Sequence, residues 1–197
     1  AVCTAVDISV KQLEHGRRLA RTHGVDIDLI EGDIMALPAT VEGDYDFIHS
    51  VYAIPFVEDQ RAVIDQAVQR LRPGGRILLS TAHPLFTGEW LALDEDEVGI
   101  FIQDYWSPVP DVRTLPDGRV GACCQAVPIS ELVTWLTDAG LVVEQLLEPR
   151  PLAAAELADE AAARRVPYDG AAWRQRMAEM SRVPAVLVVL ASWRTCG

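Results

Sequence analysis

The stretch that decides the fold is Tyr45–His83, YDFIHSVYAIPFVEDQRAVIDQAVQRLRPGGRILLSTAH. Apolar residues near its two ends predict buried strands over 45–50 and 76–81. Between these strands, apolar residues recur at helical spacing and fall on one helix face: Val63, Ile64, Ala67, Val68 and Leu71. Pro73 cannot continue that helix, and Gly74 tolerates the left-handed turn that ends it. The stretch therefore predicts a βαβ unit, in which a right-handed crossover joins two parallel strands.

The carboxyl ends of these strands are the expected place for a ligand, because sheets of this kind bind ligands beyond that edge. In this chain the two ends are residues 49–52 and 81–84. His83 stands at the second end, whereas His49 lies within the first strand and is expected to be a hydrogen-bonded core histidine.

Upstream of this unit the same alternation of strand and helix is found. An apolar strand ends at Asp7, and Ser9 is placed to cap a helix, with Gln12 three residues later as in a capping box. A short strand over 27–30 then leads to Asp33. This alternation predicts an α/β fold: a Rossmann-like, mostly parallel twisted sheet with helices on both faces.

Residues 84–128, which follow the fourth strand, break the alternation. They hold many of the aromatic residues, show no sustained period and contain a turn signal at 116–118. We expect an insertion that forms a lid over the active-site edge of the sheet, with a β-hairpin around 114–122. Beyond the insertion we expect a helix capped by Ser130, and then these elements: a strand over 141–147, helices over 152–165 and 173–180, and a last strand over 184–191 that pairs antiparallel.

Composition limits the function classes. With 197 residues, half of them hydrophobic, the chain 1–197 is expected to be one globular domain. Its net charge of −12 argues against nucleic acid or an anionic membrane as a partner, because both would repel it. No apolar run approaches the ~20 residues of a membrane helix, and no signal peptide is recognisable. Four cysteines lack metal-ligand spacing, so we expect free thiols in a reducing cytoplasm. Separately, we expect a monomer or a homodimer.

Two aspartates follow consecutive strands and could share a ligand. A carboxylate only accepts hydrogen bonds, so Asp7 could bind both hydroxyls of a ribose. Asp33 could accept from an adenine amino group while the Ile34 backbone N–H reaches a ring nitrogen. Each aspartate alone could equally cap a helix or a turn. Together, at neighbouring strand ends, they favour an adenosine site, to which Ile8 would also belong.

Four segments in this order resemble the class I S-adenosylmethionine-dependent methyltransferases: AVDIS (5–9), EGDIMALP (31–38), YDFIHSVYAIPFVED (45–59) and LRPGGRILLST (71–81). HPLF, DYW, DAGL and LLEP further along resemble a bacterial small-molecule subgroup of that family.

The resemblance implies S-adenosylmethionine as cofactor, with the ribose at Asp7, adenine at Asp33 and Ile34, and the methionine side along Ser50 and Val51. In that subgroup the segment after the strand covers the acceptor. The family's glycine-rich loop, which follows its first strand, is not found in these 197 residues. We therefore expect the methyltransferase-like domain to be N-terminally incomplete here.

Acceptor chemistry has few candidate residues. Methyl transfer needs an in-line nucleophile and exclusion of water, and a base only where the acceptor must lose a proton. His83 is the candidate base and substrate contact, although it could instead orient the turn at Pro84. Aromatic residues that could wall an apolar acceptor pocket are Tyr52, Trp90, Tyr105 and Trp106. No metal site is expected, because His and carboxylates do not recur at ligand spacing.

Two other function classes stay open. Asp7 would also suit a nucleotide-dependent oxidoreductase of the related dinucleotide fold. Against that reading, the only lysine is Lys11, so no Tyr-x-x-x-Lys couple exists. A non-catalytic methyltransferase-like binding module is the second alternative. The main prediction is S-adenosylmethionine-dependent methyl transfer to a small-molecule acceptor.

Overall fold

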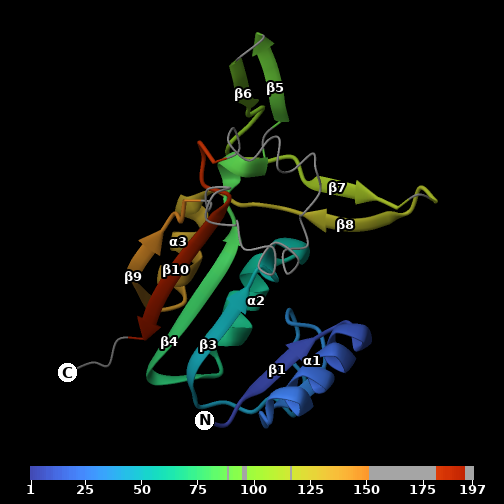
Figure 1. Cartoon of the computed structure of the whole chain (residues 1–197). Coiled ribbons are helices and arrows are strands. Elements are labelled where there is room, and N and C mark those ends of the chain that lie inside the picture. The colour runs from blue at the N-terminus through green and yellow to red at the C-terminus, as the bar shows by residue number, and fades with distance from the viewer. Residues whose placement is uncertain (88, 95–96, 116, 151–180, 194–197) are drawn as a thin grey trace.

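The computed structural model describes residues 1–87, 89–94, 97–115, 117–150 and 181–193 (Figure 1). The helices predicted over 152–165 and 173–180 lie outside these residues. The first part of the chain forms β1 (Thr4–Asp7), α1 (Val10–His23), β2 (Asp28–Glu31), β3 (Tyr45–Val51), η1 (Ile54–Phe56), α2 (Gln60–Val68) and β4 (Leu71–Ala82). The second part forms η2 (Pro84–Thr87), β5 (Glu89–Asp94), β6 (Glu97–Phe101), β7 (Asp111–Thr114), β8 (Val120–Cys124), α3 (Ile129–Asp138), β9 (Leu141–Leu147) and β10 (Val186–Trp193).

The larger sheet has the strand order β3-β4-β10-β9. β3 and β4 pair in parallel, as expected for the two strands of a βαβ unit. β10 pairs antiparallel with both β4 and β9, which confirms the predicted orientation of the last strand. The α/β fold class is therefore confirmed, with a mixed sheet at its centre.

β1 and β2 form a second, parallel sheet of their own. This sheet carries α1 and lies on the β3 side of the larger sheet (Figure 1). Within the described residues, no ladder joins β1 to β3. The single twisted sheet predicted from the alternation is thus divided between two sheets in this structure.

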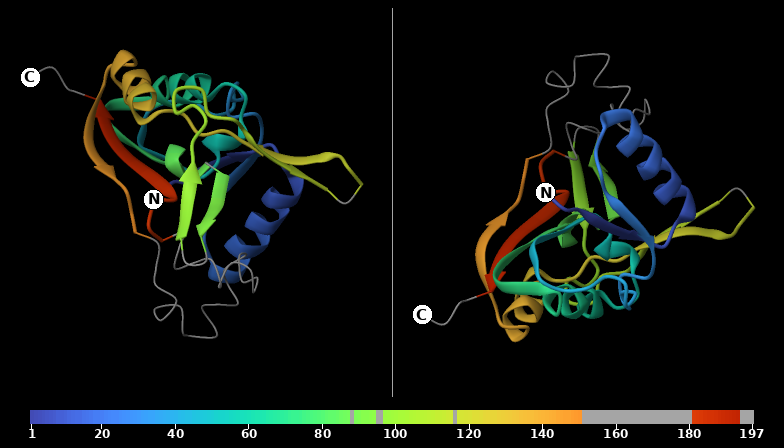
Figure 2. Two further views of the ribbon diagram at one scale, coloured as in Figure 1. Left: turned by 90° about the horizontal axis from the view of Figure 1, so that it is seen from above. Right: turned by 90° about the horizontal axis from the view of Figure 1, so that it is seen from below.

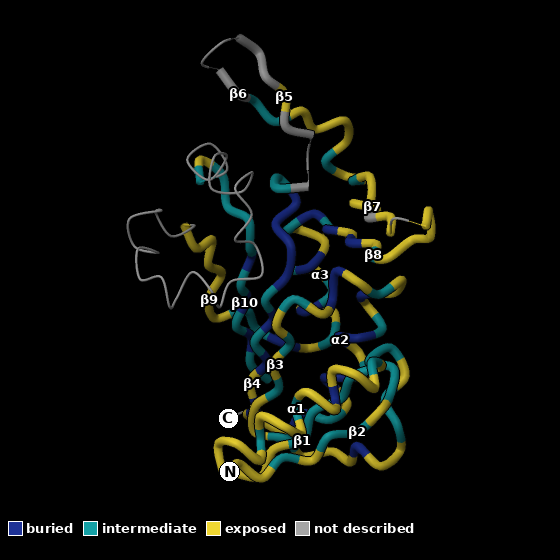
Figure 3. The backbone as a smooth tube through the Cα atoms, turned by 45° about the vertical axis from the view of Figure 1, so that its right-hand side comes forward, coloured by how far each residue is buried: buried dark blue, intermediate teal, exposed yellow. Residues whose placement is uncertain are grey.

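The main core lies between the larger sheet and the two helices α2 and α3. Ile64 from α2, Leu136 from α3 and Val189 from β10 are fully buried there. Burial is concentrated around α2, α3, β4 and β10, whereas α1 and the β7–β8 hairpin are largely exposed (Figure 3). His49 is exposed on β3 and stacks on Phe47 with ring centroids 6.0 Å apart, so the prediction that it is a core histidine is wrong.

The α2–β4 junction differs from its prediction in detail. The helix ends at Val68, before the LRPGG segment, and β4 already begins at Leu71. The β3–β4 register shifts between Tyr45 and Phe47, so the segment forms an irregular start to the strand. Gly74 has φ 78°, which favours glycine. The glycines therefore shape the strand entry, not the helix end.

Residues 84–128 form η2 and two antiparallel hairpins, β5–β6 and β7–β8. The β7–β8 hairpin confirms the one predicted around 114–122, whereas β5–β6 was not predicted. Figure 2 shows the two hairpins pointing in different directions from the sheet. In the turn of β7–β8, the Arg119 side chain donates to Asp117 and lowers the pKa of that carboxyl.

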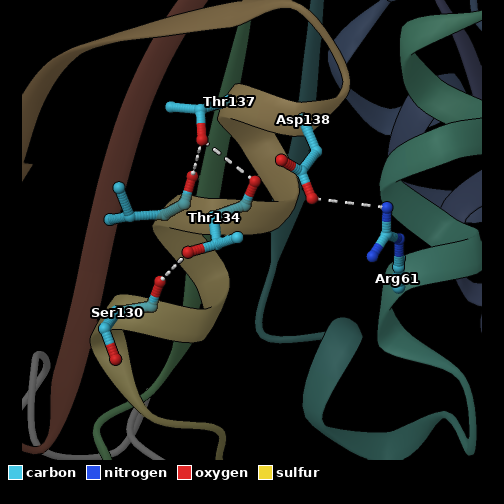
Figure 4. Close-up of polar contacts among 6 residues, drawn as sticks. Arg61, Ser130, Thr134, Thr137 and Asp138 are labelled. Carbon is cyan, nitrogen blue, oxygen red and sulfur yellow. Dashed lines mark hydrogen bonds and ion pairs between the residues drawn. The ribbon is translucent and has the colours of Figure 1, made fainter.

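α3 begins at Ile129 with Pro128 in the cap position, so the prediction that Ser130 caps it is wrong. Ser130 instead lies in the first turn, and its carbonyl accepts a hydrogen bond from the Thr134 hydroxyl at 2.8 Å (Figure 4). At the other end of the helix, Asp138 pairs with Arg61 of α2 at 3.6 Å (Figure 4). Both partners are about half exposed, so this pair contributes little to stability.

Arg70 ties the loop after β2 to α2. Its guanidinium donates to the carbonyl oxygens of Val41 (3.0 Å) and Leu37 (3.4 Å) in that loop. It also donates to the backbone carbonyl (3.1 Å) and side-chain Oε1 (3.0 Å) of Gln66. The same Gln66 Oε1 accepts from the Leu37 N–H at 3.2 Å. One partly buried arginine thus holds the chain that leads away from Asp33.

We expect Arg70→Met to lower the free energy of unfolding by about 2 kcal/mol, because its loss leaves partly buried carbonyl groups without donors. Arg72→Met is the matched control: Arg72 also pairs, with Asp46 at 2.6 Å, but both side chains are more than half exposed. The control should cost less than about 1 kcal/mol in urea unfolding. Equal losses in the two variants would contradict the role given to Arg70.

Candidate functional site

The carboxyl ends of β1 and β2 meet at one edge of their sheet. Asp7 lies opposite Glu31 in the parallel register. The Gly32 N–H donates to the Asp7 carbonyl oxygen at 3.1 Å, and Asp33 follows directly. The structure therefore brings Asp7 and Asp33 to the same edge, as the strand order in the sequence predicted.

Both aspartates also serve local turns. Asp7 Oδ1 accepts from the Ser9 N–H at 2.7 Å, and Asp33 Oδ1 accepts from the Met35 N–H at 2.8 Å. Within the described part of the chain, the second carboxylate oxygen of each has no hydrogen bond from the protein. The turn role and a ligand role are thus compatible, because one oxygen orients the side chain and the other remains an acceptor.

Gly32 is a positioning residue that the sequence reasoning did not single out. A Cβ at this position would lie 2.5 Å from Pro38 Cγ and 3.2 Å from Val6 Cγ1. The first distance is too short for any side chain, so only glycine allows β2 to turn here. The signal in the sequence is a glycine immediately before the acidic residue at a strand end.

Apolar residues flank the two carboxylates. Ile8 is 73% exposed next to Asp7, which is unusual for an isoleucine. Ile34 is half-buried next to Asp33 and packs against the main core. An exposed apolar side chain beside hydrogen-bond acceptors suits a flat, partly polar ring such as a nucleoside base.

The end of β3 carries two unusual features. Ser50 Oγ is buried and has no hydrogen-bond partner in the described structure. Tyr52 has φ 56°, a left-handed conformation that a bulky residue rarely adopts, and its N–H donates to Ser80 O at 2.7 Å. Val51, between them, is 66% exposed. Backbone strain at a strand end often marks a functional site, and this was not visible in the sequence.

His83 is fully buried at the end of β4, and both of its ring nitrogens are engaged. The Leu85 N–H donates to Nδ1 at 3.2 Å, so Nδ1 carries no proton. The ring proton therefore lies on Nε2, which faces Glu148 Oε1 at 2.9 Å. Glu148 follows β9, so this contact reaches across β10 and fixes the start of the 84–128 segment. These contacts favour a positioning role for His83 and leave no free ring nitrogen for a base.

The aromatic residues predicted for the acceptor pocket fall into separate groups. Tyr52 is half-buried and packs against the small cluster of Ala82, Cys124 and Ala126. Tyr105 and Trp106 contact each other edge to face, with centroids 5.2 Å apart. The Tyr105 hydroxyl accepts from the N–H of Ile129, at the start of α3.

Trp106 lines a cavity that also includes residues of α2 and α3, and His83 and Tyr52 do not line that cavity. Trp90 belongs to β5, but its side chain lies outside the described structure. The described contacts therefore do not join Tyr105 and Trp106 to Tyr52 and His83.

Two further properties of the described residues bear on function. They contain no group of three or more His, Cys, Asp or Glu side chains placed to hold a metal ion. Among them, no helix has the length and hydrophobicity needed to span a membrane.

Comparison with known proteins connects this geometry to a family. Residues 1–75 match the family model described as "Methyltransferase domain". A curated relative, ubiquinone biosynthesis O-methyltransferase of Xylella fastidiosa, is 27% identical over 143 residues, which are 73% of this chain and 53% of the relative. The protein of the same name from Xanthomonas euvesicatoria is 28% identical over 146 residues, 74% of this chain and 56% of its own length. The chain thus spans about half the length of these relatives.

Among solved structures, an S-adenosylmethionine-dependent methyltransferase from Mesorhizobium loti superposes with a TM-score of 0.70 at 24% identity. The match covers 97% of this chain and 80% of that one. At 24% identity, this similarity shows that the two proteins share a fold.

We expect Glu148→Ala to lower the free energy of unfolding by about 1–2 kcal/mol, because it leaves the buried Nε2–H of His83 without an acceptor. Glu144→Ala is the control, since the Glu144 carboxylate forms an ion pair with the exposed Arg76, at 3.5 Å. It should cost less than about 1 kcal/mol. Urea unfolding of both variants makes the comparison, and a Glu148 variant as stable as the control would rule out the His83 contact as a structural tie.

Proposed function

We propose that this chain is a class I S-adenosylmethionine-dependent methyltransferase that transfers a methyl group to a small molecule. The match of residues 1–75 to the methyltransferase model and the shared fold support this proposal. The observation that carries the proposal is the shared sheet edge of Asp7 and Asp33, within the segment that matches the methyltransferase model. The names of the curated relatives, which are O-methyltransferases, support the same reaction type.

The residues at this edge fit an adenosine group in chemical type. In the proposal, the outer oxygen of Asp7 accepts from the ribose hydroxyls, and Asp33 accepts from the adenine amino group. Ile8 and Ile34 provide apolar contact for the ring, and Ile34 offers its backbone N–H. Bound S-adenosylmethionine would supply an activated methyl group on a sulfonium centre.

Ser50 and Val51 are proposed to line the methionine part of the cofactor. Ser50 Oγ is buried without a partner, so a polar group of a ligand at the end of β3 would satisfy it. Tyr52, two residues after Ser50, has a strained backbone conformation that directs the chain away from this strand end. These residues would position the donor; they supply no proton.

The acceptor is proposed to bind beyond β3 and β4, under the segment 84–128 acting as a lid. Its proposed contacts are the residues predicted from the sequence, namely Tyr52, His83, Trp90, Tyr105 and Trp106. The contacts of His83 support a role in positioning the first residues of the 84–128 segment. To act as a base, His83 would first have to lose its hydrogen bond with Glu148 or with the Leu85 N–H. Excluding water is the main task of such a cover in methyl transfer.

Several coarser properties belong to the same proposal. We keep a single domain with the lid at 84–128, a cytoplasmic location, and a monomer or homodimer. The net charge of −12 supports a small-molecule acceptor over nucleic acid or an anionic membrane.

Binding of S-adenosylhomocysteine, measured by calorimetry, tests the adenosine site. We expect Asp7→Asn to keep the turn, because an amide oxygen still accepts from the Ser9 N–H, yet to weaken binding by about tenfold. Asp7→Ala should weaken it by about tenfold to a hundredfold, as the loss of hydrogen bonds to a charged acceptor implies.

Asp28→Ala is the matched control, because Asp28 is exposed at the opposite end of β2. It should leave the dissociation constant unchanged. Unaltered binding in both Asp7 variants would reject the ribose assignment, and binding of NADH in place of S-adenosylhomocysteine would favour the oxidoreductase alternative.

A further inference from the structure

A cavity of about 680 Å³ lies between the N-terminal ends of α2 and α3 and the segment 106–108. This volume is within the range of small-molecule sites. Met35, on the turn after Asp33, forms one boundary, and its sulfur accepts from the Asp59 N–H at 3.5 Å. The cavity is thus adjacent to the proposed adenosine edge, but neither Asp7 nor Asp33 lines it.

The lining of this cavity is negatively charged. Three carboxylates contribute to it: Glu58, Asp59 and Glu131. None of the described lining residues is Lys, Arg or His, and no ion pair within the described structure involves these three carboxylates. Asp59 caps α2 and Glu131 lies in the first turn of α3, so each also stabilises its helix. The two helix ends contribute roughly +0.5 charge each, which leaves the formal charge of −3 largely uncompensated.

Gln60 provides an independent indication of a ligand. Its side chain lines the cavity, is 5% exposed, and donates from Nε2 to the Gln125 carbonyl oxygen at 2.6 Å. A carbonyl oxygen can only accept, so this bond fixes the orientation of the amide. Gln60 Oε1 is then left buried without a hydrogen-bond partner in the described structure. A buried acceptor in this state needs a donor.

Two indole rings complete the cavity. Trp135 is half-buried on α3, whereas Trp106 is 71% exposed, which is high for the largest apolar side chain. Indole faces attract cations. The three carboxylates are exposed to solvent, so each adds a modest attraction that salt weakens. A ligand that carries a positive charge, N–H donors and an apolar body would satisfy all of these groups.

We propose that this cavity binds an organic ammonium group, held by the carboxylates and Gln60 and covered by Trp106. The site goes beyond the proposed methyl transfer, because none of the residues proposed to hold the methyl donor lines this cavity. The ammonium group that it would take is therefore not the one carried by S-adenosylmethionine. It is also independent of Asp7 and Asp33, so its failure and the failure of the proposed function are distinguishable by separate binding measurements.

The test is calorimetric titration of the full chain at pH 7 with 2-phenylethylamine, which carries a primary ammonium group. Its neutral counterpart, 2-phenylethanol, has the same framework without the charge. We expect the amine to bind and the alcohol to bind at least tenfold more weakly. Equal binding of the two, or no binding of the amine, would overturn the proposal, whatever the result with S-adenosylhomocysteine.

Three variants locate the binding. Trp106→Ala and Glu131→Gln change exposed side chains, and each should raise the dissociation constant of the amine at least fivefold. Gln60→Met removes the buried acceptor at similar size and should act in the same direction, with thermal unfolding recorded to check its fold. Glu14→Gln, on the exposed face of α1, is the matched control and should have no effect. Amine binding that persists unchanged in the Trp106 and Glu131 variants would place it elsewhere and contradict the proposal.

Discussion

The parallel pairing of β1 with β2 is the constraint on which the candidate site depends. It sets Asp7 opposite Glu31 and lets the Gly32 N–H reach the Asp7 carbonyl oxygen at 3.1 Å. A shift of one residue in this register would turn the side chains of one strand to the opposite face. The absence of a side chain at Gly32 is part of the same constraint, since Pro38 and Val6 occupy the space that a Cβ would need.

The loop next to that edge is held by polar contacts. Arg70 and Gln66 hold the loop after Asp33 against α2, and α2 is fixed in turn by the main core through Ile64. In the larger sheet, a second polar contact between His83 and Glu148 joins the start of the 84–128 segment to the far end of β9. Polar tethers of this kind let irregular loops hold functional groups on a rigid sheet.

Local patterns in the sequence predicted much of this arrangement. The Ser9 cap, the β3–α2–β4 unit and the antiparallel last strand all follow from capping residues and periodicity, and the structure confirms them. The shared edge of Asp7 and Asp33 also followed, because strand order determines which carboxyl ends are neighbours.

Features that depend on tertiary contacts were not predictable in the same way. The exposure of His49 and the left-handed conformation of Tyr52 depend on the tertiary fold. The hydrogen bonds of Arg70 to Val41 and Leu37 join segments that are about 30 residues apart. The same holds for the contact of His83 Nε2 with Glu148, 65 residues away. The acceptor residues are the least determined part, because Trp106 lines a separate cavity and the described contacts do not link it to Tyr52.

A crystal structure with S-adenosylhomocysteine bound would test the central claim most directly. The account predicts ribose hydroxyls within hydrogen-bond distance of the Asp7 carboxylate and the adenine amino group beside Asp33, whereas an adenosine bound away from this edge would contradict it.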